Sequence, residues 1–231
     1  MIRNIYPLSC LALLSLGVVS ALHAAGAPPA DKEREAKLIA VLKSDAQLKE
    51  KADACRELSI IGTKQCVAPL AALLRDEKLS HLARYGLEPI PDPAVDEALR
   101  AAVAELKGRP LIGVIGSLGV RRDKNAVGAL AGLLKDSDPD VARAAARALG
   151  RIGDAPATEA LEKVLEAATP AIRLAVSEGL FRCADHLTAH GKTKEAREIC
   201  EKLNRPDSPP QVRAAAVRKA SFLAKEAAPG L

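Results

Sequence analysis

The sequence contains no tryptophan, and aromatic residues of all kinds make up only 2% of its 231 residues. A core built from large aromatic rings is therefore excluded. The apolar residues, 48% of the chain, are mostly alanine, leucine and valine. Alanine and leucine favour helices, and few runs of β-branched residues favour strands. This composition predicts an all-α protein whose core consists of small and aliphatic side chains.

Motifs that carry catalysis or bind cofactors are also lacking. No serine or histidine stands in a G-x-S-x-G or H-E-x-x-H context, no glycine-rich phosphate loop precedes a helix, and no C-x-x-C-H haem motif occurs. His186 and His190 have the i, i+4 spacing of two metal ligands on one helix face, but no third ligand is evident. We therefore expect neither enzymatic activity, nor a cofactor, nor a metal.

The first thirty residues differ from the rest of the chain. Arg3 is their only charge, and the mostly apolar run from Leu8 to Val19 is too short to span a bilayer. Ala25-Gly26-Ala27 has the A-x-A form of a cleavage site. These features predict a signal peptide over residues 1–27 and an exported mature domain, 28–231, that is periplasmic or extracellular. An uncleaved membrane anchor is the alternative.

An apolar triplet at positions i, i+3 and i+4 recurs along the chain at intervals of 29 to 35 residues. Such a triplet marks one face of a helix, and a constant interval marks a repeat protein. Each triplet is followed by a longer, alanine-rich stripe, so every repeat contains two helices. The triplets begin at Leu38, Leu70, Leu99, Leu130, Leu161 and Ala196.

The ends of several helices are marked as well. Asp92-Pro93, Asp138-Pro139, Thr169-Pro170 and Ser208-Pro209 each place an N-cap residue before a proline at the first helical position. Glycines that can take the left-handed conformation are expected to end three helices. These glycines are Gly62, Gly119 and Gly153. The pattern predicts a right-handed α-solenoid, an α-α superhelix of about six antiparallel helix pairs.

The segment from Asp138 to Asp154, DPDVARAAARALGRIGD, resembles the bacterial HEAT-like repeat, a type also found in phycobiliprotein lyases. The resemblance covers roughly Ala54 to Leu223 and implies a curved solenoid used for protein contacts. It further implies that Arg143 pairs with an acidic group of a neighbouring repeat, and that Arg173 and Arg213 occupy matching positions. These three arginines are candidates for a ladder between repeats or for partner binding.

Other basic residues are candidates for partner binding. Arg147 lies in a row with Arg143 and Arg151 that faces either a partner or the acids of the next repeat. Arg121 and Arg122 form a basic cluster with Lys124 at a turn, with Lys107 and Arg109 one helix away, where an anion or an acidic partner can dock. The net charge of +5 agrees with an acidic partner.

Four cysteines of the expected mature chain fall into two pairs. Cys183 and Cys200 lie about equally far from the turn at Gly191, while Cys55 and Cys66 flank the turn at Gly62 less symmetrically. In an oxidising compartment each pair can form a disulfide. Buried free thiols are the alternative for both pairs.

The sequence therefore predicts a non-catalytic solenoid of the cell envelope that binds or scaffolds a protein and is monomeric on its own. Two alternatives remain open. One is an enzyme or chromophore lyase built on a HEAT-like fold, although a fold alone does not establish an activity. The other is a binder of anions or of the nucleic-acid backbone, against which the scarcity of aromatic residues for base stacking argues. The identity of the partner is not encoded in any motif.

Overall fold

The computed structural model describes residues 29–226, so the predicted signal peptide lies outside the described residues. Within this range the chain forms twelve α-helices and two short 3₁₀ helices, η1 (Leu73–Arg75) and η2 (Lys124–Ala126). Consecutive helices pack as six pairs, as the sequence predicted. The pairs are α1 (Pro29–Lys43) with α2 (Leu48–Ile61), α3 (Lys64–Ala72) with α4 (Ser80–Leu87), α5 (Pro93–Glu105) with α6 (Gly108–Arg121), α7 (Val127–Leu133) with α8 (Pro139–Ile152), α9 (Ala155–Leu165) with α10 (Pro170–Ala189), and α11 (Thr193–Leu203) with α12 (Pro210–Glu226).

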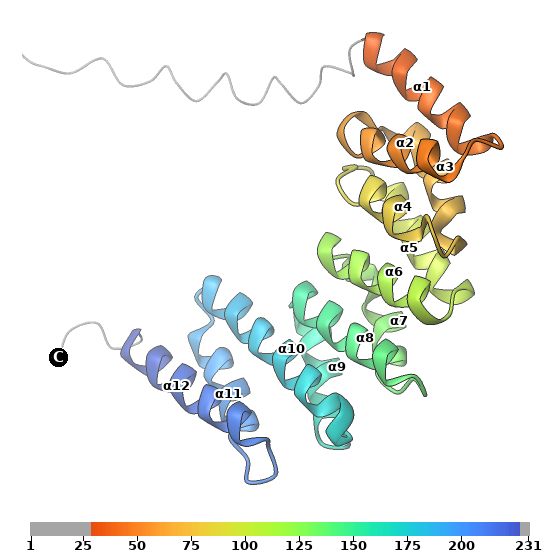
Figure 1. The fold of residues 1–231 in the computed structure, drawn as a ribbon. Helices are drawn as coiled ribbons and strands as arrows, with labels where there is room; N and C mark the ends of the chain where they lie inside the picture. Colours follow the sequence, from red (N-terminus) through yellow and green to blue (C-terminus); the bar gives the residue numbers. More distant parts are fainter. Residues whose placement is uncertain (1–28, 227–231) are drawn as a thin grey trace, which may run out of the picture.

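The pairs stack into an arc with two rows of helices (Figure 1). Neighbours in the even-numbered row, from α2 to α10, contact one another more extensively overall than neighbours in the odd-numbered row. The even-numbered row therefore forms the inner side of the arc. The last pair joins differently, because α10 contacts α11 more extensively than it contacts α12, the next even-numbered helix.

The core follows the predicted triplets. Leu70, Leu99, Leu130 and Leu161 are completely buried, each in the first helix of its pair. One continuous hydrophobic core runs from Leu42 to Leu223 through all six pairs. The alanine-rich stripes of the second helices face this core and let neighbouring helices approach closely. None of the described helices combines the length and the apolar character needed to cross a membrane.

Two predicted helix starts are confirmed with their capping bonds. The Asp92 and Asp138 carboxylates accept from the backbone N–H groups two residues on, both at 2.8 Å. The start predicted at Pro209 is wrong by one residue, because α12 begins at Pro210. A residue that precedes proline is disfavoured in the helical conformation. Pro209 stands before Pro210 and therefore stays outside the helix.

One of the three predicted glycine helix ends is confirmed. Gly153 has φ 68° and follows α8 in the left-handed conformation. Gly62 follows α2 but is extended, with φ −63°. Gly119 lies inside α6, and Arg122 takes the left-handed position with φ 54°. Gly119 has a packing role instead, since a Cβ atom there would lie 2.8 Å from the Cα of Ala148 on α8.

Candidate functional site

Arg121, in the last turn of α6, is turned into the protein. Its guanidinium makes a two-point contact with the Asp96 carboxylate, Nε to Oδ1 at 2.5 Å and Nη2 to Oδ2 at 3.0 Å. It also donates to the backbone carbonyl oxygens of Glu88 and Ile90, both at 2.8 Å. Only 11% of the Arg121 side chain is exposed. Arg121 thus holds the connector between α4 and α5 in place through hydrogen bonds, and its side chain is too buried to contact a partner.

The three arginines of the predicted ladder do not occupy matching positions. Arg173 and Arg213 directly follow the first apolar stripe residue of their helices, whereas Arg143 stands two residues after Val141. One residue along an α-helix is a rotation of about 100°. Arg143 therefore points in a different direction, and the expectation of equivalence is wrong.

The contacts of these arginines differ accordingly. Arg173 reaches the next pair, where its Nη1 donates to Asp207 Oδ2 at 3.0 Å in the loop between α11 and α12. Arg143 contacts the Asp140 carboxylate on its own helix. Arg213 donates to the backbone carbonyl oxygen of Pro206 at 3.4 Å. Arg173 therefore makes the ion pair between neighbouring repeats that the sequence predicted for this position.

The basic turn residues lie in two separate places. Lys107 and Arg109 stand at the beginning of α6, and Arg121 and Arg122 at its end. A helix of 14 residues is about 21 Å long at ~1.5 Å per residue. One anion or acidic side chain therefore cannot engage both groups.

The C-terminal ends of α6, α8 and α10 form a cleft of about 580 Å³, which we call the cationic cleft. Basic side chains enter it from three successive repeats. Arg122 follows α6, Arg151 lies near the end of α8, and Arg182 lies on α10. Two histidines and one acid complete its charged lining. These are His186, His190 and Asp185.

The arginines of the cationic cleft have no acidic partner in the part of the chain that the structure describes. Among the described residues, no carboxylate lies within 4 Å of the guanidinium groups of Arg122, Arg151 and Arg182. The one acid in the lining, Asp185, is paired with Lys219 of α12. The cleft thus presents three uncompensated positive charges to solvent, and an anionic group is the ligand chemistry that fits it.

Arg147 lies on the same row of helices but is engaged. Its Nε is 3.9 Å from Glu178 Oε2 on α10, an exposed contact between neighbouring repeats. Exposed pairs of this kind contribute little to stability, roughly 0–1 kcal/mol. Arg147 therefore remains a candidate for partner contact, because its ion pair with Glu178 is weak.

The two histidine rings of the cleft lie next to each other, tilted by 37° with ring centroids 4.3 Å apart. Partial burial, the His190 ring and the positive charges of Arg122 and Lys124 lower the pKa of His186, and Asp154 opposes them. His190 Nδ1 is 2.7 Å from the backbone carbonyl oxygen of His186. In the described part of the chain no three His, Cys, Asp or Glu side chains are grouped as a metal site.

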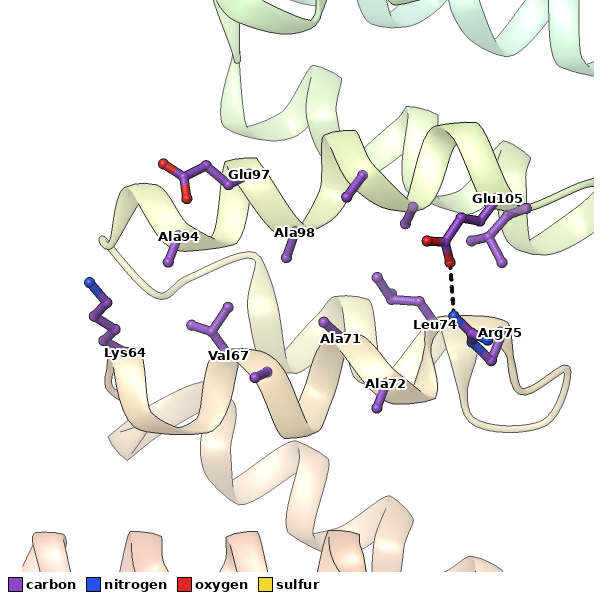
Figure 2. Close-up of a pocket in the computed structure, with 14 residues that line it drawn as sticks. Lys64, Val67, Ala71, Ala72, Leu74, Arg75, Ala94, Glu97, Ala98 and Glu105 are labelled. Atoms are coloured by element: carbon purple, nitrogen blue, oxygen red, sulfur yellow. Dashed lines mark hydrogen bonds and ion pairs between the residues drawn. The ribbon is translucent and has the colours of Figure 1, made fainter.

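A second cavity lies between α3 and α5 on the odd-numbered side, with a volume of about 550 Å³ (Figure 2). Small side chains line its floor, and we call it the alanine groove. Its ends carry charges, with Lys64 and Glu97 at one end and the 2.8 Å pair of Arg75 and Glu105 at the other. The short alanine side chains leave this space open between the two helices. The groove's lining alanines include Ala68, Ala71, Ala72, Ala94, Ala98, Ala101 and Ala102.

All four cysteines of the described chain are free and buried. The structure therefore contains buried thiols at both pairs of positions and neither of the two disulfides. Cys183 interacts with Thr158 on α9, whereas Cys200 lies near Lys219 of α12. The two thiols therefore have different neighbours, although they are similarly distant from the turn at Gly191. The Cys66 thiol donates to the Thr63 backbone carbonyl oxygen at 3.1 Å and is not bonded to Cys55.

Sequence reasoning missed the cationic cleft as a unit because Arg182 was not recognised as part of it. The signal was present in the repeat itself. Arg182 follows Arg151 by 31 residues, so the two arginines occupy equivalent positions in successive repeats. Equivalent positions on stacked helices lie side by side, which is how a solenoid assembles a surface from distant parts of the sequence.

Comparison with known proteins identifies the repeat. Residues 100–180 match the family model of HEAT repeats, a narrower range than the resemblance suggested. The fold is similar to that of an engineered protein solved by the Northeast Structural Genomics Consortium, with TM-score 0.51 and 20% identity over 83% of this chain and 97% of that one. No protein of curated function matches.

Two other solved structures are less similar. One is the complex of CpcE and CpcF of phycocyanin lyase from Nostoc sp. PCC7120, with TM-score 0.44 and 19% identity over 83% of either chain. The other is a second engineered protein of the same consortium, with TM-score 0.49 and 19% identity over 85% of this chain and 59% of that one. The central helix pairs thus carry the HEAT-repeat sequence signature, and the whole described chain has the architecture of an all-α solenoid.

Proposed function

We propose that this protein is a non-catalytic scaffold that binds a protein partner and receives an acidic segment of it in the cationic cleft. The observation that carries the proposal is the convergence of Arg122, Arg151 and Arg182 from three successive repeats on one cleft, where none of them has an acidic partner among residues 29–226. HEAT repeats commonly serve as protein-binding scaffolds, and residues 100–180 match them.

The chemistry of the cleft favours a protein ligand with several carboxylates. An arginine fork binds a carboxylate with two parallel hydrogen bonds, and arginine is enriched among the residues that dominate binding energy. The charges are spread over the ends of three helices, so an extended acidic segment engages them better than one small anion does. The charge of Asp185, the one acid in the lining, is offset by its ion pair with Lys219.

The exposure of the cleft sets the expected strength of binding. Exposed charges are screened by salt over about 8 Å at physiological ionic strength. Aromatic anchors are scarce on this surface, since the described exposed aromatics are Tyr85 and Phe222, on α4 and α12. We therefore expect an interaction of modest affinity whose association slows as salt is added.

A triple variant tests the proposal. Arg122, Arg151 and Arg182 are replaced by glutamine in the tagged protein, which is then used to capture partners from cell-envelope extract, with quantitative mass spectrometry. The matched control replaces Arg34, Arg56 and Arg75, which lie in exposed ion pairs at the other end of the arc. Both triple variants lose the same charge.

The expected result is a protein that the wild type and the control capture and the cleft variant does not. Capture should weaken between low and physiological salt, and an acidic peptide from the partner should compete for the cleft. If all three forms retain the same proteins, or if the control loses the partner as well, the cationic cleft is not the binding surface.

We also propose that the scaffold works outside the cytoplasm. The support is the three-part pattern of the first thirty residues, with Arg3, the apolar run and the A-x-A site. Mass spectrometry of the protein from the producing cell should find a mature N-terminus at Pro28. A cytoplasmic protein that still begins at Met1 would contradict the proposed export while leaving the cleft proposal intact.

A further inference from the structure

The strongest unassigned feature is a cavity of about 670 Å³ where α4 and α6 begin, which we call the basic cavity. It lies at the opposite end of α6 from the cationic cleft. Its lining is rich in hydrogen-bond donors and contains one acid, the exposed Glu77. The donor-bearing residues are Ser80, His81, Arg84, Lys107, Gly108 and Arg109.

Ser80 opens α4 and is only 5% exposed. Its Oγ atom is inaccessible to solvent and has no hydrogen-bond partner among the described residues. A buried hydroxyl without a partner costs about 1–3 kcal/mol, and native proteins contain few of them. Ser177, by contrast, is equally buried on α10 and donates to the Arg173 carbonyl oxygen at 2.9 Å. Ser80 also lines the cavity, so its hydroxyl is an unused hydrogen-bonding group in the cavity wall.

Arg84, one turn further along α4, also has a buried polar atom that makes no hydrogen bond to the described residues. This atom is Nε of its guanidinium group. The guanidinium lies against α6, where a Cβ atom built on Gly113 would come 2.5 Å from Nε. Glu88 attracts it electrostatically without a hydrogen bond to it, and the Glu88 carboxylate instead accepts from the Ser117 hydroxyl at 2.6 Å. A positive charge thus sits in the wall of the cavity with its donors unused.

The start of α6 adds backbone donors. The Lys107 side chain does not cap this helix, and the first N–H groups of a helix have no partner within it. Gly108 has φ 57°, a conformation that other residues rarely adopt, and no atom would contact a Cβ atom there. Glycine at this position therefore leaves the backbone open towards the cavity. Partial positive charge at a helix N-terminus favours anions.

We propose that the basic cavity binds a phosphate group, either free or as an ester. A tetrahedral oxyanion presents several acceptor oxygens at once, and the cavity offers a hydroxyl, a guanidinium and backbone N–H groups converging from α4 and α6. The volume exceeds that of the phosphate alone, so an organic substituent fits as well. The site is separate from the cationic cleft and does not depend on the scaffold function.

Calorimetric titration of the full-length protein with inorganic phosphate tests the proposal. Arg84→Met should weaken binding about tenfold or more, because one charge-assisted hydrogen-bond set is lost. Ser80→Ala should weaken it several-fold without lowering the thermal midpoint of the unliganded protein, because the hydroxyl it removes has no partner. Ser177→Ala and Arg197→Met are matched controls elsewhere in the chain and should leave phosphate affinity unchanged.

The remaining measurements separate the sources of the ligand. Phosphate should shift the amide NMR signals of Gly108 and Arg109. O-phosphoserine binding more tightly than inorganic phosphate identifies an ester as the better ligand, and the reverse order identifies free phosphate. Acetate binding as tightly as phosphate would overturn the assignment. So would phosphate binding that Ser80→Ala and Arg84→Met leave unchanged, or no measurable heat with millimolar phosphate.

Discussion

Gly150 of α8 and Gly179 of α10 lie against each other so closely that a Cβ atom on Gly150 would come 2.5 Å from the Cα of Gly179. The same row contains Gly119 against Ala148, with 2.8 Å between an added Cβ and the Cα of Ala148. Close backbone approach at these points is what joins the third, fourth and fifth pairs. The alanine-rich stripes in the sequence therefore have a direct structural meaning.

Replacing Gly150 by alanine should destabilise the protein by about 2 kcal/mol, because α8 and α10 must move apart to admit the methyl group. Urea unfolding should show a lower midpoint, and the thermal midpoint should fall by about 4–8 °C. Gly132→Ala on α7 is the control, since a Cβ atom there meets nothing within 4 Å. Because alanine favours helices, the control should be neutral or stabilising by up to ~1 kcal/mol. Equal effects at both positions would contradict the packing explanation.

Arg121→Gln should lower the free energy of unfolding by about 2–4 kcal/mol. The change leaves the Asp96 carboxylate unpaired and removes donors from the carbonyl oxygens of the connector. Arg75→Gln removes an arginine from a pair whose two side chains are 71% and 60% exposed, so its effect should stay below about 1 kcal/mol. Chemical denaturation of both variants checks the difference. Similar losses would show that burial does not decide the contribution of these arginines.

His186 should titrate at a lower pH than a histidine in an unstructured peptide. Partial burial and the charges of His190, Arg122 and Lys124 lower its pKa in the folded protein. The folded state then binds fewer protons than the unfolded state. This contribution to stability is fully present above the unfolded value near ~6.5 and is lost as the pH falls from there through the lower folded pKa. Arg122→Gln removes one of the charges and should raise the pKa. NMR of the imidazole protons measures both midpoints, and an unchanged midpoint in the variant would exclude Arg122 as a cause.

The buried thiols should resist modification. Burial raises the pKa of Cys55 and of Cys183 to about 11, and burial together with the charge of Glu35 raises that of Cys66 to about 12. Only the thiolate is reactive, so Ellman's reagent at pH 8 should label these cysteines in guanidinium chloride and hardly at all in the folded protein. Fast labelling without denaturant would contradict this.

The same raised pKa values give a pH dependence of stability. The folded state holds the thiol protons more tightly than the unfolded chain, whose cysteines have a pKa near 9.0. The contribution is fully present below that value and is lost as the pH rises towards 11–12. Cys66→Ser should remove part of this alkaline loss. Urea unfolding at pH 8 and pH 10.5 should therefore show a smaller difference for the variant than for the wild type, and an equal difference would exclude the thiol as its source.

The helix pairs could be predicted from the sequence because local patterns mark the core-facing side and the ends of the individual helices. The apolar triplet at Leu130, the cap at Asp138 and the left-handed Gly153 are local patterns, and the structure bears out all three. Gly119 shows where such reasoning fails. A glycine that ends a helix and a glycine that admits a neighbouring helix look the same in sequence, and only the position of Ala148 separates them.

The candidate sites were less predictable than the fold. Arg121 and Arg122 are adjacent in sequence, yet one is bound inside the protein and the other faces the cleft. The change of direction follows from the left-handed conformation of Arg122, which interrupts the helix between them. The unpartnered Ser80 hydroxyl had no signal in the sequence at all. Whether this hydroxyl has a hydrogen-bond partner depends on which groups surround it in the folded protein, and the sequence does not show that.

The junction between the second and third pairs has a mechanical consequence. Between α4 and α6 the contacts are less extensive than between α6 and α8, and two cavities flank this one junction, the alanine groove and the basic cavity. We therefore expect the arc to flex here more readily than between α6 and α8. The span of the scaffold, and hence the size of what it can enclose, changes with the angle at this junction.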